Sequence, residues 1–498
     1  MGIWVCRHAT WCVVIFSAVY WFVALRHAAH DIYGDDELTT WFIARLPSLS
    51  EMWRALLGGF EQELPLTHLL VRLSHSLLGA SHLASRLPSA VGFWVGLLSV
   101  YLFLKRHVAA PYALVGMIFP VATLAWDHVV VARAYAVLLG ATGFAMVCWQ
   151  TATSGSRLRK PALAGITVGL TIALSTHMMA IMLALPFALG ELLRSIRRRR
   201  IDFPVWVAFA LSAPVLLIYP PMLAAAAGYD FRGMYPTLGA IPDFYGELLT
   251  FAVFPVLAAV LAVYLVGRDS EDGRNPALPF HIVVALVALA SLPAIFIVIA
   301  FATRHFFLPR YGLHAVIPLA VLLAAAASHA CRGSVRSGMA ILLVFAGWAA
   351  DMRVKPTLRH MPPPTAAFDA RFPLLREALR GDLPVVVTEP NDFGLAVFYL
   401  PPPDADRLHY LIDLENARRS PFEDIGQRVM TRARVYLHMA GSVEAYSAFL
   451  LRNRRFVVHV DNRHPPGWLY YLLARDRCVV ALRNYSGGES LFTVDVAP

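Results

Sequence analysis

Charged side chains are scarce in this sequence. Asp, Glu, Lys and Arg make up 15% of the 498 residues, against about 25% in an ordinary soluble domain. Hydrophobic residues make up 58%, which leaves too few polar side chains to cover a water-soluble core of this size. The same composition excludes a disordered chain. The sequence therefore predicts a polytopic membrane protein.

Cysteine and lysine are also scarce. The five cysteines are scattered without a CxxC pair, which argues against a zinc knuckle or a disulfide framework. Three of the 43 basic residues are Lys and the others are Arg. A basic excess of this kind is typical of loops on the cytoplasmic side of a membrane protein, so we favour that interpretation over nucleic-acid binding. GxGxxG and Walker patterns are absent, so no motif indicates a nucleotide site.

Eleven apolar stretches are candidate membrane spans, since a bilayer core needs about 20 apolar residues per helix. They lie near residues 10–28, 86–104, 111–126, 129–149, 161–176, 178–193, 203–225, 247–266, 280–302, 311–331 and 338–350. We count 161–193 as two spans, because a single helix would place Arg-rich ends on opposite sides of the membrane. The first stretch lacks a convincing cleavage site and is interpreted as a retained span.

The basic clusters predict the topology. They fall in alternate short loops, which places the N-terminus in the cytoplasm. Eleven crossings then leave the C-terminus outside. The expected location is a bacterial inner or plasma membrane, crossed several times, with the C-terminal domain extracytoplasmic.

Two regions lie outside the predicted spans. Residues about 29–85 form a long first outer loop, in which Leu46–Leu56 and Leu66–Leu78 have the periodicity of amphipathic surface helices. Residues 351–498 have the composition of a small soluble α/β domain. Its strand-like runs are Pro384–Thr388, Phe456–Val460, Cys478–Leu482 and Ser490–Val494, and its helix-like runs are Val443–Arg452 and Trp468–Arg475. Residues 1–350 form the predicted transmembrane domain.

Acidic residues open the first outer loop. Asp31, Asp35, Asp36 and Glu37 lie where the first span leaves the bilayer, although carboxylates are costly near hydrocarbon. A solvated turn is one interpretation. The other is a carboxylate held at the membrane surface as a general base or a metal ligand.

Other polar residues fall on the same predicted side. They are Glu63, His68, Asp127, His128, Arg133, Tyr135, His177, Arg304, Arg310 and Tyr311. Structural alternatives exist for several of them: Glu63 as an acid at a helix N-terminus, Arg133 as a snorkelling side chain, and His177 as an interfacial polar group. A shared outer cavity would suit transfer from an anionic lipid, because guanidiniums pair with phosphate and a carboxylate can activate a hydroxyl.

Residues 1–350 resemble the GT-C superfamily of polyprenyl-phosphate-sugar-dependent glycosyltransferases. The nearest branch contains protein O-mannosyltransferases, lipid A aminoarabinose transferases and lipopolysaccharide-core galacturonosyltransferases. The motifs that carry the resemblance are Asp36-Glu37, Leu87-Pro88-Ser89, Ala132-Arg133-Ala134-Tyr135-Ala136 and Arg310-Tyr311. Glu63–His68 matches the family's His/Glu-x-Pro-Pro-Leu-Tyr-Tyr element only loosely, because Leu64 replaces a proline and Thr67 and His68 replace the aromatics.

The resemblance implies an inverting sugar transfer. Asp36 would be the catalytic base, with Asp35 in its place if the register slips by one, and Glu63 a second catalytic carboxylate. Arg310, Arg133, Arg304 and Tyr311 would bind the donor phosphate, and the remaining residues that line the site would be Glu37, His68, Asp127, His128, Tyr135 and His177. No metal is required by default; a divalent ion, if bound, would use Glu63 and His177.

The expected partners follow from the same reaction. They are a polyprenyl-phosphate-linked sugar, an acceptor hydroxyl on a glycan, lipid or protein, and the bilayer, with no nucleic acid. Two alternatives stay open. One is a catalytically inactive GT-C-like assembly or binding protein, and the substitutions in the Glu63–His68 element are the feature that favours it. The other is a lipid or solute transporter, against which the lack of internal repeats and the clustering of acids at one surface argue.

Overall fold

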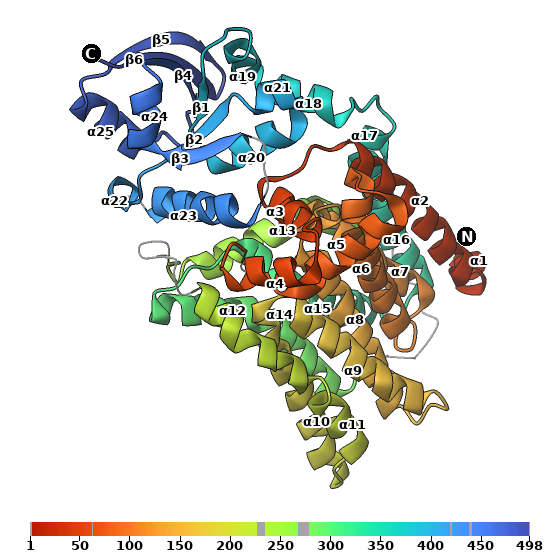
Figure 1. Ribbon diagram of the computed structural model, residues 1–498. Helices are drawn as coiled ribbons and strands as arrows, with labels where there is room; N and C mark the ends of the chain where they lie inside the picture. Colours follow the sequence, from red (N-terminus) through yellow and green to blue (C-terminus); the bar gives the residue numbers. More distant parts are fainter. Residues whose placement is uncertain are drawn as a thin grey trace. The chain divides into compact units, whose positions relative to one another are not determined.

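Helices dominate the computed structural model of this chain (Figure 1). It describes residues 2–61, 63–226, 235–266, 278–418, 421–437 and 441–497. The chain divides into two compact units: the first comprises 1–29, 63–220 and 235–360, and the second comprises 30–62, 221–234 and 361–498. Part of the predicted first outer loop therefore belongs to the same unit as the C-terminal domain.

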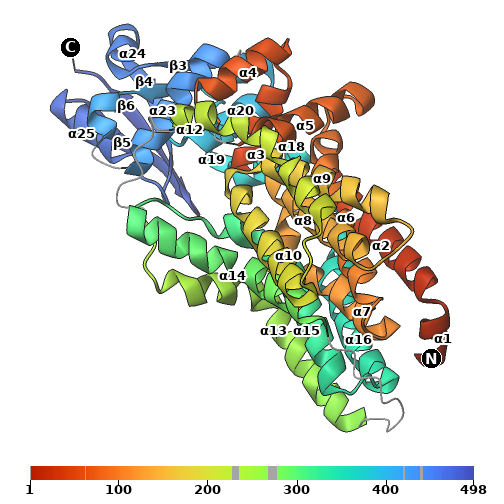
Figure 2. The same ribbon diagram turned by 90° about the horizontal axis from the view of Figure 1, so that it is seen from below.

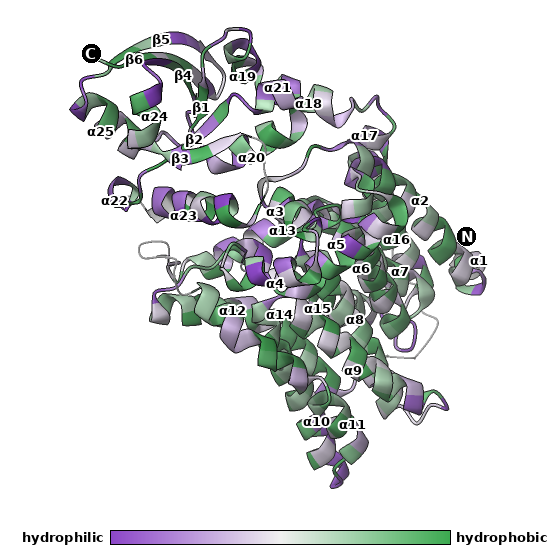
Figure 3. Cartoon of the chain, in the orientation of Figure 1, coloured by the Kyte–Doolittle hydropathy of each residue, from purple (hydrophilic) through white to green (hydrophobic). Residues whose placement is uncertain are grey.

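Nine helical segments within the described residues are long and apolar enough to cross a membrane. They are Ala9–His30 (α2), His82–Leu104 (α6), Ala134–Thr153 (α8), Met178–Arg198 (η3 and α10), Phe203–Ala226 (α11, η4 and α12), Ala240–Val266 (α13), Phe280–Thr303 (α14), Pro309–Ala330 (η5 and α15) and Val335–Thr357 (α16, η6 and α17). In Figure 3 these helices are mostly coloured as hydrophobic. The prediction of a multi-pass helical membrane protein is confirmed.

Two of the eleven predicted spans are helices but are not among these nine. The stretch near 111–126 is the short apolar segment Ala110–Ala122, made of α7 (Ala110–Ile118) and η1 (Phe119–Ala122). At 1.5 Å per residue it is only about 20 Å long. The stretch near 161–176 is α9 (Arg159–Thr176), which begins with the two basic residues Arg159 and Lys160.

The predicted break between 161–176 and 178–193 is confirmed. Helix α9 ends at Thr176, His177 is extended with φ −147° and ψ 136°, and the 3₁₀ segment η3 (Met178–Leu183) follows. The prediction for 129–149 is wrong at its start, because α8 begins at Ala134. A 3₁₀ turn, η2 (Leu124–His128), and an extended Arg133 precede it. Arg133 therefore lies at the N-terminus of the helix and not one turn inside it.

Small residues let the central helices of the first unit approach closely. Helices α6, α8 and α9 run beside one another (Figures 1 and 2), and α13 packs against α16. A Cβ atom added at Gly140 of α8 would lie 2.1 Å from the carbonyl oxygen of Gly92 on α6. Glycine at such crossings is typical of membrane helices that pack backbone to backbone.

A charged network joins α8, α9, α10 and the turn before α11. Arg194 donates to Glu191 Oε1 and to Asp202 Oδ2, both over 2.6 Å, and Trp149 donates its indole N–H to Glu191 over 3.0 Å. Arg159 Nη2 lies 2.5 Å from Asp202 Oδ1. Burial raises the pKa of Asp202, but the hydrogen bonds and charges of Arg194 and Arg159 outweigh it and hold this pKa below its ordinary value.

Asp202→Asn is expected to lower the melting temperature at neutral pH, because a carboxylate with a depressed pKa stabilises the folded state above its ordinary pKa. The difference from the unmodified protein should shrink as the pH falls below about 4, the ordinary pKa of Asp, because the unfolded chain then binds a proton at Asp202 while the folded protein still resists it. Thermal unfolding in detergent between pH 7 and pH 3 measures it. Asp351→Asn is the matched control: Asp351 pairs with exposed Lys355, and surface pairs contribute little. Equal effects of the two variants would contradict the prediction.

The second unit contains a six-stranded mixed sheet in the order β3-β2-β1-β4-β6-β5. The strands are β1 (Val385–Val387), β2 (Leu408–Ile412), β3 (Ser442–Ala445), β4 (Arg455–Asp461), β5 (Val479–Ser486) and β6 (Glu489–Asp495). The first four in the sheet order are parallel, with Val385 opposite both Leu408 and Val457, and β6 and β5 are antiparallel. The predicted small α/β domain is confirmed.

Helices surround this sheet and complete its core. They are α18 (Pro364–Arg371), α19 (Pro373–Ala378), α20 (Pro390–Tyr399), α21 (Pro402–Ala405), α22 (Leu414–Ala417), α23 (Pro421–Tyr436), α24 (Tyr446–Arg452) and α25 (Gly467–Arg475). Phe449 of α24 and Leu469 of α25 pack with Phe456 and Val458 of β4. The four predicted strands are present, but the helix predicted over Val443–Arg452 is wrong at its beginning, where β3 pairs with β2.

Three helices come from the predicted first outer loop. In the second unit, α3 (Asp35–Ala44) is followed by α4 (Leu49–Leu57). Ser48 caps the start of α4, because its side chain accepts a hydrogen bond from the backbone N–H of Glu51. In the first unit, α5 (Pro65–Leu78) begins at a proline, as the fixed φ of that residue favours. The predicted amphipathic helices are therefore present as α4 and α5.

Candidate functional site

A buried ion pair joins two of the predicted site residues in the first unit. Arg133 Nε lies 2.8 Å from Glu63 Oε1, and their side chains are 8% and 4% exposed. The same oxygen accepts the backbone N–H of Ala134 over 3.3 Å, so Glu63 also satisfies a donor at the N-terminus of α8. On the other side, the Ser89 hydroxyl donates to the Arg133 carbonyl over 3.2 Å. The sequence motifs around Ser89 and Arg133 are thus in direct contact.

Four rings from four segments lie beside this ion pair. Tyr135, the second residue of α8, has its ring centroid 5.2 Å from that of His128, 5.8 Å from that of His177 and 6.4 Å from that of Tyr311. His177 and Tyr311 are 4.9 Å apart. These rings come from the turn before α8, from α8, from the break after α9 and from η5 (Pro309–Ala315). Tertiary packing has brought them together from distant parts of the sequence.

A second guanidinium belongs to the same group. Arg310 directly precedes Tyr311 in η5, and the Tyr311 ring lies beside those of Tyr135 and His177. We refer to this group as the Arg133 cluster. It comprises Glu63, His128, Arg133, Tyr135, His177, Arg310 and Tyr311. It combines two cations, one anion and several ring or hydroxyl groups, which is a set able to bind a phosphate.

The three other predicted residues of the first unit are His68, Asp127 and Arg304. His68 is fully buried on α5, one turn after its first residue. Asp127 pairs with Arg353 over 3.7 Å. Burial raises the pKa of the Asp127 carboxyl, and the charge of Arg353 opposes this rise. Arg304 is exposed and ends α14 with a left-handed backbone, φ 53°.

Sequence reasoning missed Arg353. Its guanidinium lies over the rings of Trp126, Phe251 and Trp348, with distances to the ring centroids of 5.5, 5.3 and 5.6 Å. Such contacts hold a cation in place at the edge of an apolar region. An Arg that closely follows the last apolar stretch is the only sequence signal for it, and this signal does not identify the aromatic partners.

The predicted carboxylates of α3 belong to the second unit and have different surroundings. Glu37 is buried, and its Oε2 accepts the backbone N–H of Gly34 over 2.7 Å. This is the reciprocal half of a capping box, so Glu37 fixes the start of α3. Asp36 is partly exposed in the first turn. Asp35 is the first residue of the helix, and its side chain lies outside the described part of the structure.

The residues predicted for a divalent ion do not fit one. Within the described ranges, no group of three or more His, Cys, Asp or Glu side chains is arranged to hold a metal. Glu63 is engaged by Arg133, and Nδ1 of His177 accepts the backbone N–H of Met179 over 3.2 Å. A cation beside Glu63 would also face the charge of Arg133. The positions fit an anion better than a metal.

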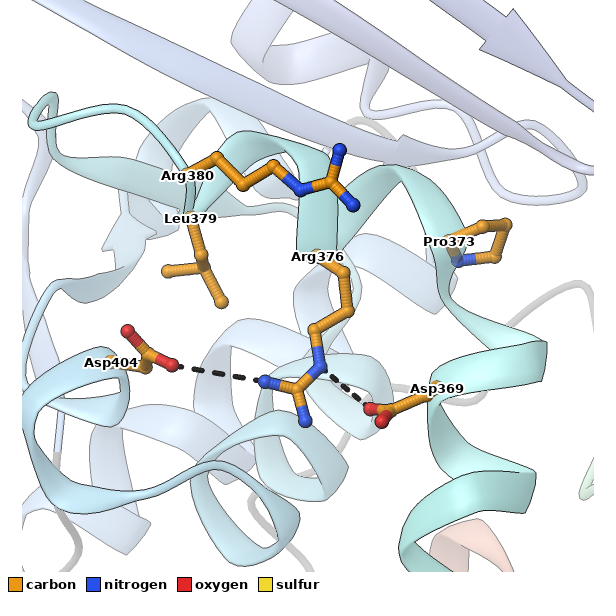
Figure 4. A pocket seen from close by; sticks show the side chains of 6 residues that line it. All are labelled: Asp369, Pro373, Arg376, Leu379, Arg380 and Asp404. Carbon is orange, nitrogen blue, oxygen red and sulfur yellow. Dashed lines mark hydrogen bonds and ion pairs between the residues drawn. The ribbon is translucent and has the colours of Figure 1, made fainter.

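A polar cavity of about 570 Å³ lies in the second unit (Figure 4). It is lined by Asp369, Pro373, Arg376, Leu379, Arg380 and Asp404. Arg376 lies between two carboxylates, with Nε 2.6 Å from Asp369 and Nη1 3.7 Å from Asp404. Its lining suits a hydroxylated ligand better than an isoprenoid chain. None of the predicted site residues lines it.

Comparison with known proteins identifies the fold. No protein-family model matches this sequence, and no curated protein does. Among solved structures, ArnT from Cupriavidus metallidurans bound to undecaprenyl phosphate has a TM-score of 0.59 at 12% identity, over 98% of each chain. Its apo form gives 0.58 at 13% identity, again over 98% of each chain. The archaeal oligosaccharyltransferase AglB from Archaeoglobus fulgidus, in complex with an inhibitory peptide and a dolichol-phosphate, gives 0.42 at 11% identity, over 99% of this chain and 75% of that one.

These matches concern the fold. The chain has the GT-C-type architecture of ArnT along nearly its whole length. The fold implied by the motifs around Asp36, Arg133 and Arg310 is therefore confirmed. The roles of the individual side chains stay predictions.

Proposed function

We propose that this protein is a membrane glycosyltransferase that moves a sugar from a polyprenyl-phosphate donor to an acceptor hydroxyl. The observation that carries the proposal is the Arg133 cluster, a set of guanidiniums and ring side chains around a buried ion pair within a bundle of apolar helices. Its chemistry suits the phosphate of a lipid that is itself held in the membrane. The ArnT structure that shares this fold is bound to undecaprenyl phosphate, which supports a donor of the same class.

In this proposal Arg310 and Arg133 bind the donor phosphate. A guanidinium presents two parallel N–H groups to phosphate oxygens, and Tyr311 and His177 add neighbouring polar groups. Glu63 holds Arg133 in position through their ion pair. When the sugar departs, negative charge grows on the phosphate, and donors arranged in advance stabilise that charge without reorganisation.

Asp36 is the proposed general base. It accepts the proton of the acceptor hydroxyl as the hydroxyl oxygen bonds to the anomeric carbon of the sugar. The bond from that carbon to the phosphate oxygen breaks on the opposite face, and the lipid phosphate leaves with the bonding electrons. One displacement inverts the configuration at the anomeric carbon. Glu37 is assigned the structural role of capping α3 and not the role of base, because its carboxylate is occupied by Gly34.

Arg310→Ala is expected to raise the KM for the donor by about tenfold or more, since a hydrogen bond to a charged group contributes about 1.5–3 kcal/mol. Arg310→Lys should recover part of this loss, because Lys keeps the charge but not the planar pair of donors. Membranes containing each variant are supplied with a radiolabelled polyprenyl-phosphate sugar, and its transfer is followed. Arg157→Ala, at an exposed loop position, is the control. An unchanged donor KM in Arg310→Ala would remove Arg310 from the phosphate site.

A further inference from the structure

We infer that the C-terminal domain positions Asp36, and that Tyr399 and Phe398 of α20 are the positioning residues. The inference rests on the proposed function, in which Asp36 is the base. All the contacts that carry it lie within the second unit, which contains both α3 and the C-terminal domain. It assigns to this domain a role in the chemical step, although neither positioning residue is itself proposed to touch the substrate.

The segment that leads into α3 is hydrogen-bonded to α20. The backbone N–H of Tyr33 donates to the Tyr399 hydroxyl over 2.9 Å. The Tyr33 ring is fully buried and meets Phe398 edge to face, with centroids 5.2 Å apart. Gly34 follows at once and donates to Glu37. The chain is therefore fixed at two successive residues directly before the turn that carries Asp36.

The body of α3 packs on the same helix. Trp41 meets Phe398 edge to face at 4.9 Å, so Phe398 contacts aromatic rings both before and within α3. Between them, Leu38 Cδ1 lies 3.9 Å from the position that a Cβ atom at Gly394 would occupy. Since Leu38 and Trp41 are one helical turn apart, they present one face to α20. That face sets the rotation of α3 and hence the direction of Asp36.

Tyr399 is in turn supported from within the domain. Its ring stacks on Phe368 of α18, with centroids 5.2 Å apart and planes 24° from parallel. Phe368 contacts Phe372 at 5.0 Å, and both phenylalanines are buried. The Tyr399 hydroxyl that accepts from Tyr33 thus belongs to a ring that Phe368 holds in place. Positions held this way by neighbouring side chains keep a site within the small tolerance that catalysis requires.

The end of the same loop segment is fixed by a different helix. Arg432 of α23 donates to the carbonyl of Gly59 over 2.6 Å. Gly58 lies against Tyr436, so closely that an added Cβ would be 2.3 Å from the phenol oxygen. The C-terminal domain therefore holds this segment at its start through α20 and at its end through α23. A displacement of about 1 Å at a reacting group can cost 10²-fold in rate.

Kinetics of full-length variants in membranes test the inference. Tyr399→Phe removes the hydroxyl but keeps the ring, and Phe398→Leu removes both edge contacts but keeps an apolar side chain. Each is expected to lower kcat by about tenfold, short of the 10²-fold that a full displacement can cost, while the donor KM stays within twofold of the unmodified value. Tyr470→Phe, on partly exposed α25, is the matched control and should change neither constant. Unchanged kcat in both α20 variants would overturn the inference.

A double-variant measurement separates positioning from a general loss of structure. If Tyr399 acts through Asp36, adding Tyr399→Phe to Asp36→Asn should not lower the residual rate further. A further loss equal to that of Tyr399→Phe alone, or a parallel change in donor KM, would assign Tyr399 to general stability and overturn the inference. Failure of the proposed function has a different signature, because the unmodified protein would then release no sugar, and a wrong assignment of the base would leave Asp36→Asn with full transfer.

Discussion

Asp36→Asn is expected to lower sugar transfer by about 10²–10⁴-fold, the range by which a positioned general base accelerates a reaction. Asn has nearly the same shape as Asp but cannot accept the proton of the acceptor hydroxyl. Asp36 is partly exposed in the first turn of α3, so the exchange leaves the buried packing of this helix unchanged. Donor binding and the melting temperature should stay close to those of the unmodified protein. Release of labelled sugar from the polyprenyl-phosphate donor measures the effect.

Neighbouring carboxylates supply the controls for this prediction. Glu37→Gln keeps an oxygen that can accept the N–H of Gly34, so it should retain α3 and most of the transfer activity. Asp35→Asn tests the alternative register. Should Asp36→Asn and Asp35→Asn both retain full activity, the assignment of the base to this turn is wrong.

Arg133→Met is expected to destabilise the protein by about 3–5 kcal/mol, the usual cost of removing one partner of a buried ion pair and leaving the other in place. The loss arises because the charge of Glu63, which is 4% exposed, is left in a region that water barely reaches. Thermal unfolding in detergent should show a marked fall in melting temperature. Transfer should be lost as well, since Arg133 is one of the two proposed phosphate ligands.

A second substitution distinguishes the two effects. Adding Glu63→Gln to Arg133→Met removes the uncompensated charge, and Gln can still accept the N–H of Ala134. The melting temperature should recover most of the loss, because exchanging both members of a buried pair is often nearly neutral. Transfer should stay low. Recovery of transfer together with stability would mean that Arg133 has only a structural role.

The two alternative functions predict different results in the same membranes. A GT-C-like assembly protein would bind the donor lipid without releasing its sugar, in the unmodified chain as well as in the variants. A transporter would move labelled substrate across sealed vesicles without breaking its bond to phosphate. Neither alternative predicts that Asp36→Asn and Arg310→Ala affect separate kinetic constants.

The sequence by itself determined the elements whose signal is local. Long apolar runs identified the membrane helices, and the break at His177 followed from the basic residues on both sides of 161–193. Strands β1, β4, β5 and β6 and helices α4 and α5 were also predicted, because apolar periodicity over a few residues is enough to form them. The expectation that the acids and guanidiniums of the site fall on one side of the membrane came from the positions of the apolar runs and basic loops.

Tertiary structure decided which of these polar residues meet. Glu63 and Arg133 are seventy positions apart, and His177 and Tyr311 are farther, so no local spacing could indicate their contacts. Packing also distinguished Glu37, whose carboxylate caps a helix, from Asp36, and it placed 30–62 in one unit with the C-terminal domain. Strand β3 formed where a helix was expected because pairing with β2 outweighs local preference. Contacts between distant segments depend on the folded backbone, and a sequence read locally does not contain them.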